Sequence, residues 1–95
     1  MTRPRIELTR AATKDLDRLP GSSRDQVLAD VRTLQSDPLG SPPRVKRLRG
    51  FGIPLHRLRS GDYRVLYRLD ADVVTVMRIV DRKDLERQLR QLRRA

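Results

Sequence analysis

The chain has no cysteine in 95 residues and only three aromatic side chains, Phe51, Tyr63 and Tyr67. The absence of cysteine excludes disulfides, thiolate zinc sites and a thiol nucleophile, and it is compatible with a reducing cytoplasm. No apolar run approaches the roughly 18 residues of a membrane-spanning helix, and the N-terminus lacks the hydrophobic core of a signal peptide. We therefore expect one cytoplasmic domain over residues 1–95, with no metal, cofactor or membrane contact.

Basic residues are abundant and unevenly spread. Lysine and arginine number 22 against 12 acidic residues, which gives a net charge of +10. Residues 1–43 hold seven basic and six acidic residues, a balance of +1, whereas residues 44–95 hold fifteen and six, a balance of +9. The field of the second half attracts a polyanion, most simply nucleic acid, or an acidic protein partner.

The first half of the chain predicts a strand followed by two helices. Residues 3–8 alternate weakly and favour a short edge strand, since Pro4 cannot sit in a central one. Thr9 can cap a helix that ends at Pro20 and Gly21. A second helix is predicted from a capping-box pattern, Ser23 with Gln26, and ends before Pro38. These two helices would form an αα-hairpin on one face of a sheet.

The segment from Leu55 to Arg82 predicts a three-stranded antiparallel meander. Its strands are separated by turn-forming residues at 60–62 and 70–72. Along the middle strand, alternate residues are apolar, and the residues between them are partly cationic. The apolar set is Tyr63, Val65, Tyr67 and Leu69, and the other set is Arg64, Leu66 and Arg68. The cationic face is where we expect function.

Cross-strand pairing brings arginines together in either of two registers. A loop at residues 60–61 places Arg57 opposite Arg64, whereas a loop at residues 61–62 places Arg59 there. In both cases two guanidinium groups face each other and repel, unless they splay into water, pair with neighbouring acids or share an anion. A phosphate held by both side chains is a natural reason to keep such a pair.

Two further arginines depend on how the meander continues. A three-residue loop at residues 70–72 would place Arg78 beside Arg64, and a two-residue loop would not. Arg82 follows the last strand and would complete the cluster. Upstream, residues 44–49 interleave Val45 and Leu48 with four bases, which fits either a strand or an extended basic loop.

The end of the chain predicts a helix that docks on the domain. Asp81 and Asp84 fit its cap and first turn, and its narrow apolar stripe consists of Leu85, Leu89 and Leu92. Glu86 and Arg90 have the spacing of an ion pair on its surface.

This order of elements resembles the RelE/ParE superfamily of bacterial toxins from type II toxin–antitoxin pairs. The most specific segments are LTRAATKDLDRLP, LHRLRSGDYRVLY and the RKDL that follows the last strand. The resemblance covers almost the whole chain. It implies an α+β fold with an N-terminal strand and αα-hairpin packed on a twisted antiparallel β-sheet, and a C-terminal helix. It also implies an acidic antitoxin that wraps the toxin.

The same resemblance suggests a site. Arg64 matches the sheet arginine that contacts the scissile phosphate in RelE-like mRNA interferases, and Arg57 and Arg82 match two further basic positions. Three positions depart from the pattern and put catalysis in doubt: Leu55 replaces a lysine, Asp81 a histidine and Glu86 a tyrosine. Further RNA or phosphate contacts are expected from Arg59, Arg78, Lys83, Lys46 and Arg47.

The implied reaction is attack of an RNA 2′-OH on the adjacent phosphate. Arginines can neutralise the phosphoryl oxygens but are poor bases, which leaves Glu86 and His56 as titratable candidates, with Asp81 behind them. Strand parity puts His56 on the face opposite Arg57, which favours a core-edge histidine. Glu86 could act as the base only if the last helix overhangs the arginines; otherwise it is an ordinary surface carboxylate.

Three functions stay open. The first is an endoribonuclease that cleaves mRNA on the ribosome, blocks translation and meets operator DNA only through its antitoxin complex. The second is a ParE-like, non-enzymatic inhibitor of DNA gyrase. The third is a degenerate toxin that only binds its antitoxin or DNA. Because both tyrosines are predicted in the core and Phe51 is the only other ring, we expect no platform of rings on which RNA bases could stack, which favours an enzyme that relies on the ribosome's grip on the message.

Overall fold

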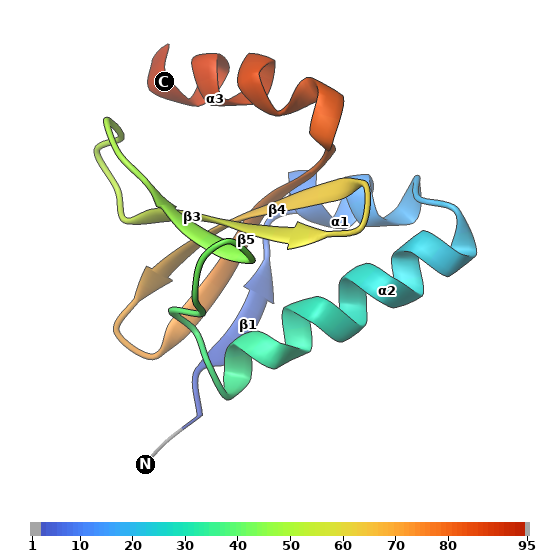
Figure 1. Ribbon diagram of the computed structural model, residues 1–95, viewed down its shortest axis with the longest axis horizontal. Coiled ribbons are helices and arrows are strands. Elements are labelled where there is room, and N and C mark those ends of the chain that lie inside the picture. The colour runs from blue at the N-terminus through green and yellow to red at the C-terminus, as the bar shows by residue number, and fades with distance from the viewer. Residues whose placement is uncertain (1–2, 95) are drawn as a thin grey trace.

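A computed structural model of the chain, which describes residues 3–94, has a five-stranded sheet with helices on both faces (Figure 1). Helices α1 (Arg10–Asp17) and α2 (Gly21–Arg32) cover one face, and α3 (Leu85–Arg94) lies across the other. The strands are β1 (Arg5–Leu8), β2 (Val45–Leu48), β3 (Leu55–Ser60), β4 (Tyr63–Asp70) and β5 (Val73–Asp81). Two short 3-10 turns, η1 (Thr33–Gln35) and η2 (Arg82–Asp84), follow α2 and β5. The predicted α+β class is confirmed.

The strand order is β1-β5-β4-β3-β2, and β3, β4 and β5 form the predicted antiparallel meander. The basic segment at 44–49 also supplies a strand, β2, which pairs antiparallel with β3 at the sheet edge. The predicted antiparallel arrangement is formed by β2, β3, β4 and β5, and β1 departs from it because it pairs parallel with β5. A parallel pair needs a long crossover, and helices α1 and α2 with strands β2, β3 and β4 provide it here.

The first core layer lies between the sheet and the α1–α2 hairpin. Ala12 of α1 and Val27 of α2 pack with buried residues of β3, β4 and β5. Tyr67 is fully buried in this layer, and its hydroxyl donates to the carbonyl oxygen of Pro38 at 2.7 Å. Burial raises the pKa of Tyr67 to about 12. Tyr63 packs against the same cluster, so the predicted core face of β4 is confirmed.

The second core layer lies beneath α3. Leu89 of α3 is buried against Leu55 and Leu66, and Leu85 and Leu92 pack on the same cluster. The predicted leucine stripe therefore docks on the domain. Because α3 covers one end of this sheet face, it forms one wall of the site described below.

The helix boundaries differ from two predictions. Thr9 caps α1 as expected, with its Oγ1 accepting from the Ala12 N–H at 3.1 Å. The capping box at Ser23 is wrong: α2 begins at Gly21 after Pro20, and the Gln26 side chain donates to Asp30 instead. Proline suits this boundary because its φ is fixed near the helical value and it has no N–H to satisfy. Asp81 caps η2, so α3 begins at Leu85.

Both hairpin loops have two residues, Gly61-Asp62 and Ala71-Asp72. Beyond the second loop, β5 holds one extra residue opposite the Leu66–Tyr67 step of β4, since Tyr67 pairs with Val76 but Leu66 pairs with Arg78. This β-bulge at Met77 shifts the alternation of the rest of β5. None of the helices in the described residues is long and apolar enough to cross a membrane.

Candidate phosphate-binding site

An arginine pair sits at the end of the β3–β4 hairpin. The two-residue loop at Gly61 and Asp62 sets the register in which Arg59 lies directly opposite Arg64. Gly61 has a φ of +56°, a conformation that glycine adopts without strain. Of the two registers that the sequence allowed, the one that joins Arg59 to Arg64 is therefore formed.

Two more arginines join this pair on the face of the sheet that carries α3. Arg57 lies two residues before Arg59 on β3 and therefore points the same way. Arg82 follows β5, and its backbone N–H donates to the carbonyl oxygen of Asp62 at 2.9 Å, which holds it beside the hairpin loop. We call Arg57, Arg59, Arg64 and Arg82 the arginine patch.

Arg64 is the most buried member of the patch, with 8% of its surface exposed. Its Nη1 donates to the carbonyl oxygens of Gly61 and Tyr63 at 3.0 and 2.8 Å. Burial lowers the pKa of Arg64, and the positive charges of Arg59 and Arg82 lower it further, against a smaller opposing effect of Asp62 and Asp81. Both hydrogen bonds come from one nitrogen, which leaves Nη2 and Nε to meet an anion.

Arg57 is half-buried and partly unsatisfied. Its Nη2 donates to the carbonyl oxygen of Pro43 at 3.0 Å, while its Nε is buried and has no partner among the residues that the structure describes. Burial lowers the pKa of Arg57, and so do the charges of Arg64 and Arg59. Arg57 and Arg59 lie on the same face of β3, and Arg59 lies opposite Arg64, so the three positive charges share one face of the sheet.

Acidic side chains compensate this charge only weakly. The contact between Arg82 Nε and Asp62 Oδ1 is 3.9 Å long, and both side chains are mostly exposed. Exposed ion pairs of this kind contribute at most about 1 kcal/mol. The patch is therefore a cluster of positive charge suited to an anion with several oxygen atoms, such as a phosphate diester.

A cleft between β2 and α3 borders the arginine patch. We call it the β2–α3 cleft; its volume is about 410 Å³. The residues that line it are Lys46, Arg47, Leu48, Arg49, Phe51, Glu86, Leu89 and Arg93. Lys46 is the strand partner of Arg57, so the cleft and the patch meet at neighbouring strands. Glu86 lines this cleft, and its predicted ion pair with Arg90 is absent from the described residues.

Three further predicted contact residues lie outside the arginine patch. Arg47 is paired with His56, so its side chain starts on the opposite face from Lys46. Lys83 is exposed in η2, where its backbone N–H donates to Asp81 Oδ1. Arg78 is not beside Arg64, whose partner on β5 is Val80. The two-residue loop and the bulge together set this register.

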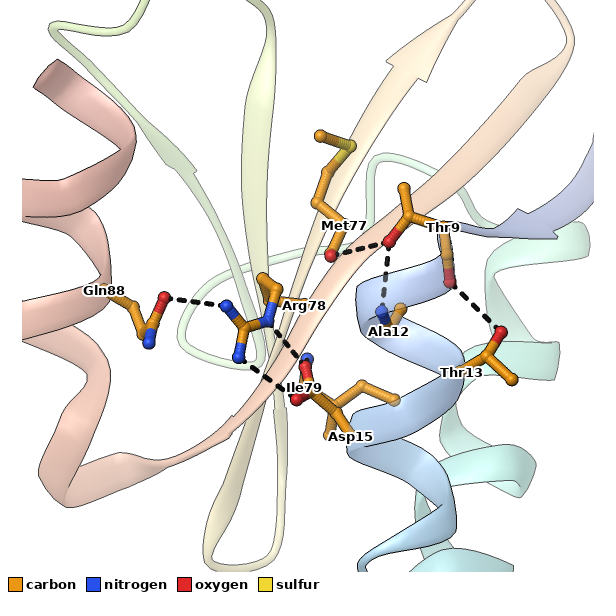
Figure 2. Close-up of polar contacts among 8 residues, drawn as sticks. All are labelled: Thr9, Ala12, Thr13, Asp15, Met77, Arg78, Ile79 and Gln88. Atoms are coloured by element: carbon orange, nitrogen blue, oxygen red, sulfur yellow. Dashed lines mark hydrogen bonds and ion pairs between the residues drawn. The ribbon is translucent and has the colours of Figure 1, made fainter. Parts of the chain in front are cut away.

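Arg78 instead links three elements, as Figure 2 shows. Its Nε and Nη2 donate to the two carboxylate oxygens of Asp15 on α1 at 2.7 and 3.1 Å, and its Nη1 donates to Gln88 of α3 at 3.1 Å. The hydrogen bonds to Asp15 and the charge of that carboxylate raise the pKa of Arg78. Because all three nitrogens are engaged, Arg78 positions α1 and α3 around β5.

Asp15 is the residue in this arrangement that sequence reasoning missed. Its Oδ2 also accepts from the backbone N–H of Ile79 at 2.9 Å, beyond the point where β1 ends (Figure 2). Thr9 acts in the same way, since its Oγ1 donates to the carbonyl oxygen of Met77. Both side chains satisfy the open edge of β5. No local pattern signals this role, because the partners are more than 60 residues apart.

His56 lies in the core edge rather than in the patch. Only 6% of its surface is exposed, and its ring stacks on Tyr67 with centroids 5.1 Å apart. Burial lowers its pKa; a hydrogen bond to the backbone of Pro54 opposes this, and the charge of Arg47 adds to it. Its Nδ1 is buried without a partner in the described part of the chain. No group of three or more metal-ligating side chains occurs within residues 3–94.

Known proteins share this fold and sequence pattern. The family model described as ParE toxin of type II toxin-antitoxin system, parDE, matches residues 6–86. A chain of the archaeal RelE–RelB complex from Pyrococcus horikoshii is 30% identical with a TM-score of 0.70, over 86% of this chain and 97% of that one. A chain of the RelBE2 toxin–antitoxin complex from Mycobacterium tuberculosis is 29% identical with a TM-score of 0.70, over 84% and 99%.

More distant structures share the fold as well. A chain of the chromosomal ParDE system from P. aeruginosa is 19% identical with a TM-score of 0.63, over 83% of this chain and 96% of that one. No curated protein sequence matches the chain. The fold and the extent of these matches define a toxin of the RelE/ParE superfamily. Within it, the chain belongs to the family of ParE toxins of type II toxin–antitoxin systems.

Proposed function

We propose that this toxin inhibits translation by cleaving mRNA on the ribosome, and that the arginine patch binds the scissile phosphate. The observation that carries the proposal is the pairing of Arg59 with Arg64, with Arg57 and Arg82 around them. Four guanidinium groups held together in this way cost stability unless an anion offsets their repulsion. A backbone phosphate supplies such an anion.

In the proposed reaction the 2′ oxygen attacks the adjacent phosphorus, and the bond from phosphorus to the 5′ oxygen breaks. The products are a 2′,3′-cyclic phosphate and a 5′ hydroxyl. Arg57, Arg64 and Arg82 stabilise the charge that develops on the phosphoryl oxygens. Glu86 accepts the 2′ proton from the β2–α3 cleft, and a water molecule protonates the departing 5′ oxygen. The ribosome holds the message in line for attack.

The positive charge also favours an acidic antitoxin as partner. The chain carries a net charge of +10, and the P. horikoshii and M. tuberculosis structures are complexes of a toxin with an antitoxin. We propose that a cognate antitoxin binds this toxin in the cytoplasm. Contact with operator DNA would then occur only through that complex.

The decisive test replaces Arg64. After brief induction, primer extension on cellular mRNA should show new 5′ ends within translated codons for the wild type and none for Arg64→Ala. Arg68→Ala is the matched control, because Arg68 lies on the same face of β4 at its far end and pairs with Asp70 at 2.8 Å. Antitoxin binding should persist in both variants. Growth arrest that persists in Arg64→Ala would overturn the proposal.

Glu86 has its own test. Glu86→Gln keeps the shape of the side chain but removes its ability to accept a proton. We expect ribosome binding to persist and cleavage to fall by about 100-fold or more, the lower range for a lost general base. Unchanged cleavage would remove Glu86 from the mechanism and leave the arginine patch in place.

A second candidate function is inhibition of DNA gyrase, as in the ParE branch. It is favoured by the match to the ParE family model and by the departures at Leu55, Asp81 and Glu86 from the nuclease pattern. In that case induction would trigger an SOS response and leave transcripts intact. A toxin that only binds its antitoxin would give neither outcome and no growth arrest.

A further inference from the structure

The β2–α3 cleft holds the one aromatic ring that lies outside the first core layer. Phe51 packs on the cluster beneath α3 and lines the cleft. The guanidinium of Arg93 lies over this ring, 5.0 Å from its centroid. In Figure 1 the loop between β2 and β3 reaches toward the carboxyl end of α3, which brings these two residues together.

The guanidinium of Arg93 also lies close to Gly50 of the loop. A Cβ added to Gly50 would lie 3.8 Å from Arg93 Nε. A guanidinium that lies over a ring still has an outer side on which a base can stack, and unstacked RNA bases stack on arginine planes as well as on rings.

The rest of the cleft suits a nucleoside. Leu48 and Leu89 provide apolar surface, and Lys46 and Arg49 provide positive charge. The volume of about 410 Å³ falls in the usual range for small-ligand sites. Glu86 lies on the same wall as Arg93, where a ribose hydroxyl or a base amino group could donate to its carboxylate. Glu86 is the one acidic side chain of this lining, so a phosphate or an acidic side chain would be repelled only where it directly faces Glu86.

The cleft also lies at a suitable distance from the arginine patch. Lys46, in the cleft, and Arg57, in the patch, are directly paired on neighbouring strands, which are about 4.8 Å apart. A nucleotide whose phosphate is bound by the patch could therefore place its base in the cleft.

We propose that the β2–α3 cleft binds one unstacked base of single-stranded RNA, stacked on the Phe51–Arg93 pair, next to the phosphate bound by the arginine patch. This inference rests on the proposed mRNA cleavage and adds the part of the substrate that lies beside the scissile bond. It assigns to Phe51 and Arg93 a role in binding and none in proton transfer.

The test uses Phe51 as a single reporter, because it is the only phenylalanine of the chain. The full-length toxin labelled with 4-fluorophenylalanine should give one ¹⁹F signal from the cleft. A trinucleotide of RNA should shift this signal in a saturable way, and inorganic phosphate and an abasic ribose phosphate should not. Arg93→Ala should weaken trinucleotide binding about tenfold, the usual cost of losing one stacked base.

The matched control is Arg90→Ala, which removes the same charge from an exposed position of α3 that does not line the cleft. Its affinity should stay within about twofold of wild type, the range of ordinary exposed charges. Equal shifts with the abasic ribose phosphate, equal losses in both variants, or a shift with an acidic peptide alone would each overturn the inference. The Arg64→Ala test of mRNA cleavage does not depend on any of these results.

Discussion

His56 is buried with its ring stacked on Tyr67, and this burial makes its protonation costly. Burial lowers its pKa below the usual value of about 6.5, so the unfolded chain takes up a proton at a higher pH than the folded one. The contribution of His56 to stability is therefore complete above about pH 6.5 and is lost as the pH falls toward the folded-state pKa.

This residue predicts a pH dependence of stability. The free energy of unfolding should fall between pH 7.5 and pH 5, with a slope from His56 of at most about 1.4 kcal/mol per pH unit. His56→Phe keeps the stack on Tyr67 but cannot titrate, so its slope should be smaller. Urea titrations at several pH values measure both slopes. Since His56 is the only histidine, equal slopes would contradict this account.

Asp15 provides the second prediction at this scale. Its carboxylate, 10% exposed, accepts from the Arg78 guanidinium and from the Ile79 backbone. Asp15→Asn leaves a partly buried guanidinium without its counter-charge, so we expect a loss of about 2 kcal/mol in urea unfolding. Asp17→Asn, an exposed change on the same helix, should cost less than about 0.5 kcal/mol. Similar losses in both variants would argue against the link between α1 and β5.

The two hairpins of the meander differ in the first residue of the loop. Gly61 has a φ of +56°, and Ala71 has a φ of +52° at the corresponding place in the next loop. This conformation costs a residue with a Cβ roughly 1–2 kcal/mol. Part of that cost is offset because glycine loses more entropy on folding.

Exchanging glycine and alanine at these two loop positions should therefore change the stability of the protein in opposite directions. Ala71→Gly should stabilise the protein, and Gly61→Ala should destabilise it, each by about 0.5–1 kcal/mol in thermal or urea unfolding. A Cβ on Gly61 would meet no atom within 4 Å, so the backbone conformation alone is tested there. A loss of stability in Ala71→Gly would show that the alanine side chain contributes more than its strain costs.

At the scale of single elements, the local sequence pattern was enough to predict which faces are buried, but it did not predict the strand register. The alternation of β4 and the leucine stripe of α3 predicted their buried faces, because period alone decides which side chains share a face. The register of the arginine pair stayed open, since Ser60, Gly61 and Asp62 all suit a turn. In the structure Ser60 pairs with Tyr63, which leaves Gly61 and Asp62 as the loop. The bulge at Met77 has no sequence signal, so Arg78 could not be placed.

At the scale of the whole molecule, what could not be predicted is long-range. The parallel pairing of β1 with β5 joins segments almost 70 residues apart, and the role of Asp15 depends on it. The resemblance of the whole chain supplied the α+β architecture, and the family model confirms the superfamily. Of the predicted phosphate contacts, Arg57, Arg59, Arg64 and Arg82 come together and Lys46 lies beside them.

The charge distribution of the molecule predicts a salt dependence. If single-stranded RNA contacts the four arginines of the patch, the logarithm of its affinity should fall with the logarithm of salt concentration with a slope of about −3. Arg64→Ala should reduce this slope by about 0.7. Arg32→Ala removes an exposed charge from α2, on the other side of the sheet, and should leave the slope unchanged. Fluorescence anisotropy of labelled RNA at salt concentrations from about 50 to about 200 mM measures this slope. Equal slopes in the wild type and both variants would show that the RNA binds elsewhere.

The bulge residue Met77 allows β5, but not its neighbour β4, to lose one residue without a change of register. Val76 and Arg78 pair with adjacent positions of β4, so losing Met77 would close the gap and leave every later side chain on its present face. A one-residue deletion within β4, which has no bulge, would move every following side chain to the other face of the sheet. Arginines would then enter the core and apolar side chains would leave it. Removing Met77 from β5 should thus keep both core layers, whereas removing a residue from β4 should not.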